Sequence, residues 1–463
     1  MKTILLMLII IIEIFECKIQ QDYLCISDQD DQMIELKSNE HCGSKTSYLT
    51  ARYDRKLLLE RDWHLNNQQC KPIYLYFLGR HSIRFPGLKE IIKQERLMPK
   101  YAKIISKNGT KLSNGIRHDL HYWTLMYDQT DQYHVTLSGK YETQTIAKIF
   151  YRYFPKLLNV DRIDVSVSRK IRTRETAWAF LRTLYDIQTP NSNKHTLKWD
   201  NKLNKMVSRH KIVESDLLMI HERCKKFGSP KEGKSAKYKE LFHSLSFDKM
   251  RNDFSQRNGI KNEENFTIEH MYLLKSLCCY EQAIYQQSPW CSLFKPYERF
   301  AFNYLDDIKS YTDAYGYGIN RKMACVLIAD LRRKLIMARD DPHSINTTLY
   351  FGHDHLMYRL FSYLNLFEQF PHFKYDRNGQ ICLPINREWD SSTITPFGTN
   401  FVAILYDCDE DDDQKKLLTL VNENVVEIPG CTNGFCPLDE FLNYYEHLEN
   451  DCKIEDICRL PES

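Results

Sequence analysis

The chain lacks a strong excess of charge of either sign, because 64 basic residues face 61 acidic ones and the formal net charge is +3. Such a balance argues against a nucleic-acid-binding or membrane-surface protein, so any binding of anions must be local. Long hydrophobic runs are also scarce, although 43% of the 463 residues are apolar. That content allows a sizeable core, and the length fits two domains or one domain with a large insertion.

One pronounced apolar run, residues 4–12, follows Lys2 near the N-terminus. It is too short to span a membrane comfortably, and the pattern is typical of a secretory signal peptide that is cleaved near Cys17. An uncleaved signal anchor is the alternative. The C-terminal Leu-Pro-Glu-Ser carries neither a KDEL-type retention signal nor a GPI-type tail. The sequence therefore predicts a protein of the secretory-pathway lumen or the extracellular space, without stable membrane insertion after signal cleavage.

The cysteines lack the paired CxxC spacing of a zinc knuckle. Fifteen cysteines agree instead with an oxidising compartment, and an even number remains if Cys17 leaves with the signal peptide. The close pairs Cys431/Cys436 and Cys452/Cys458 predict local disulfides, whereas the spacing leaves the other pairings open. Three N-x-[ST] sequons predict N-glycosylation, at Asn108, Asn265 and Asn346.

Residues 73–87, IYLYFLGRHSIRFPG, combine a buried strand with a charged end. The first half is short, continuous and β-prone, as in a strand buried within a sheet. The second half places Arg80, His81 and Arg84 at the carboxyl end of the strand, where α/β sheets bind ligands. Two guanidinium groups, each able to hold an oxyanion bidentately beside an imidazole, indicate chemistry on a phosphate. Solvated charges at a strand end are the alternative.

Two further predicted strands end in similar residues. Residues 163–167 alternate as a strand does and lead into a basic segment that contains Arg172. Of the four basic residues in that segment, one or two are expected to face a site. Residues 346–351 form another strand, which is followed by His353 and Asp354. A sheet could therefore bring together side chains that lie far apart in the sequence.

The strand pattern nearly vanishes between the second and third of these strands. From about residue 190 to residue 340 apolar residues recur at helical spacing, which predicts an α-helical insertion in an α/β sheet domain. The predicted division is a signal peptide over 1–17, a first part of the sheet domain over 18–190, the insertion over 191–340, and a second part with a disulfide-linked tail over 341–463. Further predicted elements are strands at 401–406 and 425–428 and a helix at 437–448.

Three motifs resemble those of the histidine acid phosphatases. Arg80-His81-x-x-Arg84-x-Pro86 resembles the RHGxRxP signature of that family. Ser168-x-x-x-Arg172-Thr173-x-x-Thr176-Ala177 resembles its second arginine motif, and Gly352-His353-Asp354 resembles its distal His-Asp motif. Any one motif is weak evidence, but all three in the right order are specific.

Other segments are similar to the multiple inositol polyphosphate phosphatase branch of that family. They are Lys89, five residues after Arg84, HERCKKF at 221–227, PWCSLF, GYGIN at 316–320, NFVAILYDC and the cysteines near the C-terminus. The resemblance covers nearly the whole mature chain. It implies a histidine phosphatase fold, in which a Rossmann-like sheet domain is flanked by helices and carries a large inserted helical domain.

The resemblance also implies roles for individual residues. His81 would be the nucleophile of a phosphohistidine intermediate that forms without a metal or other cofactor, and Asp354 would protonate the leaving group. The phosphate would be held by Arg80, Arg84, Arg172 and His353, while Lys89 would contact another phosphate of the substrate. The resemblance implies small-molecule substrates, which are inositol polyphosphates and also 2,3-bisphosphoglycerate, and not nucleic acids.

Two residues depart from the family pattern. Ser82 replaces the glycine of RHG, where the backbone approaches the phosphate closely, so its Cβ crowds the ligand or its hydroxyl donates to it. His355 follows Asp354 where this branch has the Glu of His-Ala-Glu, so the expected acid is Asp354, as in phytase-like relatives. Ser82 and His355 are both expected to contact the substrate. The alternatives are a helix N-cap role for Asp354, a broad-specificity acid phosphatase, and a non-catalytic secreted phosphate-binding relative.

Overall fold

The computed structural model describes residues 23–25, 41–53, 70–189, 213–224, 236–261, 265–341, 346–370, 372–408 and 415–459. The predicted signal peptide, residues 1–17, lies outside these ranges. In the described part of the chain, no helix is long and apolar enough to cross a membrane.

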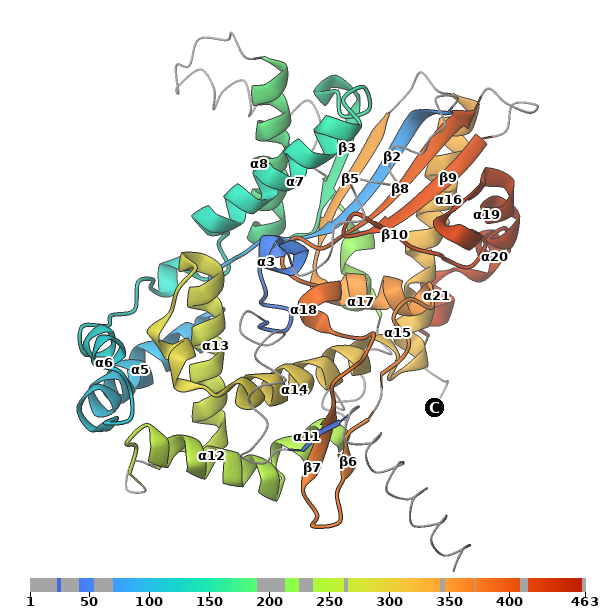
Figure 1. Ribbon diagram of the computed structural model, residues 1–463. Helices are drawn as coiled ribbons and strands as arrows, with labels where there is room; N and C mark the ends of the chain where they lie inside the picture. Colours follow the sequence, from blue (N-terminus) through green and yellow to red (C-terminus); the bar gives the residue numbers. More distant parts are fainter. Residues whose placement is uncertain are drawn as a thin grey trace, which may run out of the picture.

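The described residues form a mixed eight-stranded sheet in one half of the molecule (Figure 1). Its strands are β2 (Cys70–Arg80), β3 (Ile163–Val167), β4 (Val213–Glu214), β5 (Thr347–Gly352), β8 (Asn400–Cys408), β9 (Lys415–Val421), β10 (Asn424–Val425) and β11 (Phe435–Pro437). The order is β10-β9-β8-β2-β5-β3-β4, and β11 pairs with β9. The strands β2, β5, β3 and β4 run parallel, whereas β8 is antiparallel to both β2 and β9.

Helices cover both faces of the sheet, which explains why β2 is an almost continuous apolar run. On one face Phe77 packs against Phe150 of α7 (Leu137–Tyr153) and Phe180 of α8 (Ile171–Gln188), with ring centroids 5.4 and 5.5 Å apart. On the other face lies α16 (Cys325–Asp340), whose Asp330 accepts a hydrogen bond of 2.9 Å from Tyr350. The α/β sheet predicted from the sequence is confirmed.

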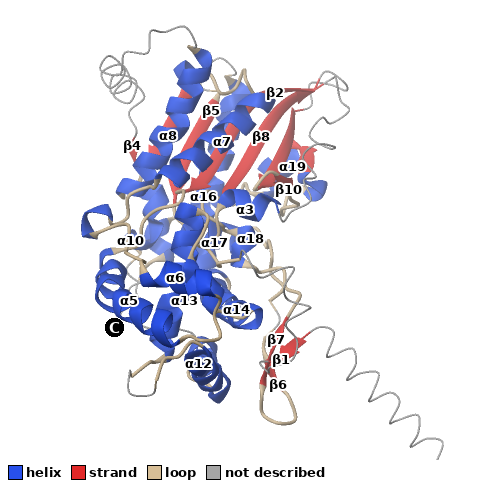
Figure 2. Ribbon diagram, turned by 60° about the vertical axis from the view of Figure 1, so that its left-hand side comes forward, coloured by secondary structure: helices blue, strands red, loops and turns tan. Residues whose placement is uncertain are grey.

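The other half of the molecule is helical (Figure 2). Its main helices are α5 (Leu88–Asn108), α6 (Asn114–His121), α12 (Leu245–Arg257), α13 (Ile268–Tyr285) and α14 (Pro296–Ala314). Although α5 and α6 precede residue 190, Tyr101 of α5 packs on Phe266 and on His270 of α13. Conversely, α16 packs on the sheet although it lies within residues 191–340. The division at 190 and 340 stays a prediction about folding units.

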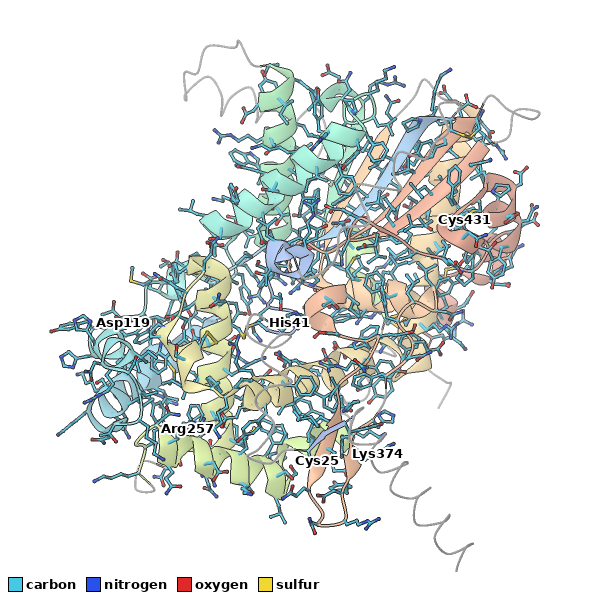
Figure 3. All side chains as sticks on the ribbon, viewed as in Figure 1. Cys25, His41, Asp119, Arg257, Lys374 and Cys431 are labelled. Atoms are coloured by element: carbon cyan, nitrogen blue, oxygen red, sulfur yellow. A yellow bond between two sulfur atoms is a disulfide. The ribbon has the colours of Figure 1, made fainter. Side chains whose placement is uncertain are left out.

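Shorter elements complete the described chain. The helices are α3 (Tyr48–Tyr53), α10 (Ile220–Arg223), α11 (Ala236–Phe242), α15 (Gly318–Met323), α17 (Asp354–Tyr363), α18 (Ser391–Ile394), α19 (Leu438–Tyr444), α20 (Leu448–Asp451) and α21 (Ile454–Ile457), and the 3-10 helices are η1 (Gln129–Asp131), η2 (Val160–Arg162), η3 (Asp216–Met219), η5 (Pro289–Leu293) and η6 (Thr432–Gly434). A small sheet of β1 (Tyr23–Cys25), β7 (Ile381–Pro384) and β6 (Lys374–Tyr375) lies at the far end of the helical half, where Cys25 and Lys374 are labelled in Figure 3.

All 14 cysteines after Cys17 form seven disulfides. The predicted Cys431–Cys436 bridge is confirmed. The predicted Cys452–Cys458 bridge is wrong, because Cys452 bonds to Cys325 and Cys458 bonds to Cys224. The C-terminal tail folds back over helices from the middle of the chain, so its cysteines meet partners 127 and 234 residues away. Bridges that close such long loops restrict the unfolded chain strongly.

Candidate active site

Three strand ends meet at one edge of the sheet. In the register of the parallel strands, Arg80 at the end of β2 pairs with Gly352 at the end of β5, and Val167 at the end of β3 pairs with Phe351. The backbone N–H of His81 then donates to the carbonyl of Gly352 at 3.0 Å. The segments that follow these strands are therefore neighbours, as the sequence predicted.

The imidazole rings of His81 and His353 are close, with centroids 5.5 Å apart. The Nδ1 atom of His81 lies 2.9 Å from the carbonyl oxygen of Ser82. Because a carbonyl only accepts, Nδ1 carries the proton and Nε2 keeps its lone pair. The Nε2 atom of His353 lies 2.8 Å from the hydroxyl of Ser168, while its buried Nδ1 has no partner among the described residues.

Both imidazoles are held neutral. Burial, followed by the guanidinium groups of Arg80 and Arg84, lowers the pKa of His81 well below its ordinary value. Burial and Arg172 lower the pKa of His353 in the same way. A neutral imidazole with a free Nε2 can act as a nucleophile at an acidic pH at which an ordinary histidine would be protonated.

Arg80 is fixed by the surrounding loops. Its Nη1 donates to the carbonyl oxygens of Ser44 at 2.6 Å and Thr395 at 2.8 Å, and its Nη2 donates to Oδ2 of Asp354 at 3.3 Å. The guanidinium carbon also lies 4.6 Å from the ring centroid of Phe397. These contacts leave Arg80 one orientation, in which it holds the carboxylate of Asp354 at the site.

Arg84 and Arg172 face the same aromatic ring. Their guanidinium carbons lie 5.4 and 5.3 Å from the ring centroid of Tyr133, and Arg84 Nη1 donates to the hydroxyl of Tyr280 at 3.3 Å. A Cβ at residue 87 would lie 2.6 Å from Tyr133 Oη, so Gly87 allows the tyrosine to approach. Neither guanidinium forms an ion pair with a carboxylate of the described residues, and both Nε atoms are buried without a partner there. Two guanidinium groups that face one ring and form no ion pair with a described carboxylate are suited to binding an anion.

Asp354 begins α17, directly after His353. Burial would raise its pKa, but the positive charge of Arg80, above all, outweighs burial and holds the pKa well below its ordinary value. Its Oδ1 also accepts from the backbone N–H of His355 at 2.9 Å, so the carboxylate has a helix-terminus contact as well as the ion pair. In the ligand-free protein Asp354 is therefore ionised, and it needs a further anion beside it to become a proton donor.

The three residues predicted to contact the substrate differ in their surroundings. Ser82 is fully buried, donates its N–H to Thr176 Oγ1 at 3.1 Å, and has a hydroxyl with no partner among the described residues. His355 Nδ1 lies 3.1 Å from Oδ2 of Asp313. Lys89 is exposed on the first turn of α5. Ser82 therefore lies beside His81, the candidate nucleophile. Lys89 projects from α5, the helix that follows the segment of His81 and Arg84.

The sequons also lie in different environments. Asn265 is exposed just before α13, and Asn108 is half-buried at the end of α5. Asn346 is 8% exposed, and its amide nitrogen lies 3.5 Å from the carbonyl of Lys156. A glycan on Asn346 would have to displace that side chain, whereas one on Asn265 would not.

The sequence did not indicate several residues that complete this site. Tyr133 and Tyr280 lie in segments without a motif, and Ser44 belongs to the segment 41–53, whose sequence shows little helical or strand periodicity. The one signal in that segment was Cys42, because a disulfide to an unknown partner implied a fixed position.

Comparisons with known proteins agree with this geometry. The profile described as "Histidine phosphatase superfamily (branch 2)" matches residues 61–422. The chain is 26% identical to multiple inositol polyphosphate phosphatase 1 of Drosophila melanogaster, over 95% of this chain and 91% of that protein. It is 25% identical to the Homo sapiens protein of the same name, over 87% of this chain and 85% of that protein.

Two solved structures share the fold. The phytase from D. castellii superposes with a TM-score of 0.66 at 15% identity, covering 94% of this chain and 93% of that one. The Bifidobacterium longum multiple inositol polyphosphate phosphatase in complex with inositol hexasulfate gives a TM-score of 0.58 at 12% identity, covering 90% and 99%. These likenesses confirm the predicted histidine phosphatase fold. The chain belongs to the histidine phosphatase superfamily, branch 2, and is a phosphoric monoester hydrolase.

Proposed function

We propose that this protein hydrolyses the phosphomonoesters of inositol polyphosphates through a phosphohistidine intermediate on His81. The observation that carries the proposal is a neutral, buried His81 with a free Nε2 beside Arg84 and Arg172, which form no ion pair with a described carboxylate. The choice of substrate follows the relatives, which are named as multiple inositol polyphosphate phosphatases, and the inositol hexasulfate held by the Bifidobacterium longum protein.

The reaction has two steps on these side chains. The Nε2 atom of His81 attacks phosphorus while the bond to the inositol oxygen breaks, and Asp354 gives its proton to that oxygen. Water then attacks the phosphorus, the P–N bond breaks, and Asp354 takes a proton from the water. Inorganic phosphate leaves, and His81 and Asp354 return to their starting states.

Each remaining residue has a role that its position supports. Arg84, Arg172 and His353 hold the three equatorial phosphoryl oxygens, and Arg80 positions Asp354. The incoming phosphate is an anion next to Asp354, so it raises the pKa of that carboxyl and allows it to carry the proton. Ser82, His355 and Lys89 contact the rest of the substrate.

We also propose that the chain is secreted into an oxidising compartment and carries glycans on its two more accessible sequons, at Asn108 and Asn265. The seven disulfides support that compartment, because they persist where thiols are not kept reduced. Mass spectrometry of the protein secreted from a eukaryotic host, before and after deglycosylation, tests this, and unmodified Asn108 and Asn265 would contradict it.

One comparison separates the three functions that the sequence left open. The purified protein is assayed at about pH 5, between the ordinary pKa values of aspartate and histidine, with inositol hexakisphosphate and with 4-nitrophenyl phosphate. We expect the higher kcat/KM with inositol hexakisphosphate. An equal or higher value with the aryl phosphate would indicate a broad acid phosphatase, and binding of inositol hexakisphosphate without phosphate release would indicate a non-catalytic relative.

A further inference from the structure

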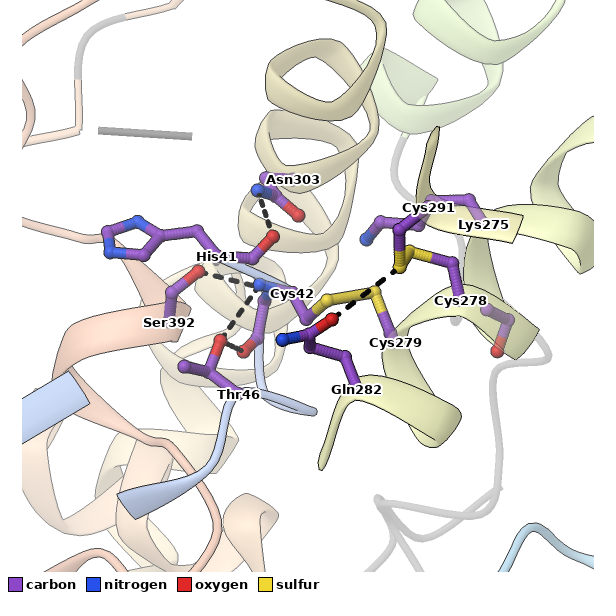
Figure 4. Close-up of a disulfide and its surroundings, with 12 residues drawn as sticks. His41, Cys42, Thr46, Lys275, Cys278, Cys279, Gln282, Cys291, Asn303 and Ser392 are labelled. Atoms are coloured by element: carbon purple, nitrogen blue, oxygen red, sulfur yellow. Dashed lines mark hydrogen bonds between the residues drawn. A yellow bond between two sulfur atoms is a disulfide. The ribbon is translucent and has the colours of Figure 1, made fainter. Parts of the chain in front are cut away.

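A segment far from the three motifs forms one side of the site. Residues 41–48 are fastened by the Cys42–Cys279 disulfide, by a hydrogen bond from Asn303 to the carbonyl of His41 at 2.9 Å, and by one from Gly43 N–H to Ser392 Oγ at 3.0 Å (Figure 4). His41 lies between the helical half and the sheet half of the molecule (Figure 3). The carbonyl of Ser44 in this segment accepts the hydrogen bond from Arg80 described above.

Lys45 follows Ser44 and lies over the ring of Tyr280, which also contacts Arg84. Its ammonium nitrogen lies 5.8 Å from the ring centroid of Tyr280, and the hydroxyl of the same ring accepts the hydrogen bond from Arg84. One tyrosine therefore links the cation of Lys45 to a cation of the phosphate site. Among the described residues, the Lys45 ammonium has no hydrogen bond and no ion pair.

Asp306, the carboxylate that acts most strongly on the charge of Lys45, already forms an ion pair with another lysine. Asp306 forms an ion pair of 2.9 Å with Lys275, which is 2% exposed, and also accepts a hydrogen bond from Tyr272. Burial opposes the charge on Lys45, but Asp306, Tyr280 and Glu90 more than compensate and raise its pKa. Lys45 therefore stays charged, although its ammonium forms no ion pair with a carboxylate of the described residues.

We propose that Lys45 binds a second phosphate group of the substrate, one that is not being transferred, and so favours polyphosphates over monophosphates. This inference rests on the proposed function. Lysine binds phosphate as a point charge, which suits a group whose ring position differs between successive substrates. Because the disulfide and the backbone hydrogen bonds already fix the segment, binding there orders little additional chain.

The competing explanation is that Lys45 only balances the charge of Asp306 and Glu90. In that case its replacement would reduce stability and would affect every substrate alike. A second-phosphate site predicts instead a loss confined to substrates with more than one phosphate. The ratio of two substrates therefore distinguishes the explanations, whereas a single activity does not.

The test uses Lys45→Met, Lys45→Arg and, as a matched control, Lys103→Met, which removes an exposed lysine from α5. For Lys45→Met, we expect KM for inositol hexakisphosphate to rise about tenfold, and the ratio of its kcat/KM to that of 4-nitrophenyl phosphate to fall about tenfold. Lys45→Arg should recover most of the ratio, and Lys103→Met should not change it. A ratio equal to that of the wild type in Lys45→Met would overturn the proposal.

A binding measurement keeps this inference separate from the proposed activity. Calorimetry compares the Kd of inositol hexakisphosphate for His81→Ala with that for His81→Ala/Lys45→Met, since neither needs to turn over substrate. We expect a Kd about tenfold weaker in the double variant. If the wild type releases no phosphate but this difference appears, the activity is wrong and the Lys45 site stands. An unchanged Kd rejects the site. If Lys45→Met does not fold, Lys45→Gln takes its place in both measurements.

Discussion

The imidazole of His353 lies edge-on to that of His81, with ring centroids 5.5 Å apart and an interplanar angle of 66°. The hydroxyl of Ser168 fixes the His353 ring from one side, which leaves the other nitrogen buried and without a partner among the described residues. An unpaired buried nitrogen is costly, so a ligand acceptor at this place is the physical expectation. Under the proposed function, this nitrogen would donate a hydrogen bond to an oxygen of the phosphoryl group that His81 attacks.

Asp354→Asn tests whether Asp354 is the proton donor, by comparing two substrates whose leaving groups differ in their need for a proton. The amide cannot supply a proton, so kcat for inositol hexakisphosphate should fall by roughly 10²- to 10⁴-fold. The aryl oxygen of 4-nitrophenyl phosphate leaves readily without protonation. The fall in kcat with this substrate, measured in steady-state assays, should therefore be at least tenfold smaller. Equal losses on both substrates would mean that Asp354 acts by some means other than protonating the leaving group.

Ser82→Ala tests the residue that departs from the family signature. The variant removes a buried hydroxyl without a partner in the ligand-free protein, so the free energy of unfolding should rise by about 1 kcal/mol. If the hydroxyl donates to bound substrate, KM for inositol hexakisphosphate should rise several-fold. Urea denaturation and steady-state kinetics measure the two effects. A less stable variant with an unchanged KM would show that the hydroxyl serves the protein and not the substrate.

Glu142 makes stability depend on pH. Its carboxylate is buried and accepts the N–H groups of Tyr48 and Leu49 at the start of α3, and burial, against these bonds, raises its pKa from 4.5 to about 7. The folded state binds this proton more tightly than the unfolded state does. The contribution of protonated Glu142 to the free energy of unfolding is therefore complete below pH 4.5, and it is lost as the pH rises through about 7.

Glu142→Gln should remove that pH dependence. Between about pH 5 and about pH 8 the wild type should lose up to about 3 kcal/mol of unfolding free energy relative to the variant, at about 1.36 kcal/mol per pKa unit. Urea denaturation across this range measures the difference, and Glu446→Gln, an exposed position, is the control. Parallel profiles for the wild type and Glu142→Gln would contradict the raised pKa.

The sequence predicted the part of the site that local pattern determines. A buried apolar run that ends in a charged motif identifies a strand and also the edge of the sheet at which the charged residues lie. Parallel pairing of the strands then brings the segments of His81, Arg172 and His353 together. The sequence did not indicate Tyr133, because its approach depends on how the loop before α7 packs over Gly87. It did not indicate Lys45 either, because that segment is positioned by a disulfide partner more than 200 residues away.

Two further differences have the same origin. Spacing suggested a Cys452–Cys458 bridge, but pairing depends on which helices the tail crosses. The strand β9 was not predicted, since it begins with two lysines after an acidic run and its identity comes from pairing with β8. Tertiary contacts determine both outcomes, and neither leaves a periodic signal in the sequence.

Trapping the covalent intermediate tests the central claim most directly. The wild type and His81→Ala are mixed with ³²P-labelled inositol hexakisphosphate and quenched within a single turnover, and the labelled peptide is mapped. The account predicts an acid-labile, alkali-stable label on the peptide that contains His81, absent from His81→Ala, whose turnover should be lower by roughly 10³-fold or more while its unfolding transition stays cooperative. A label on another residue, or unlabelled protein during active turnover, would contradict it.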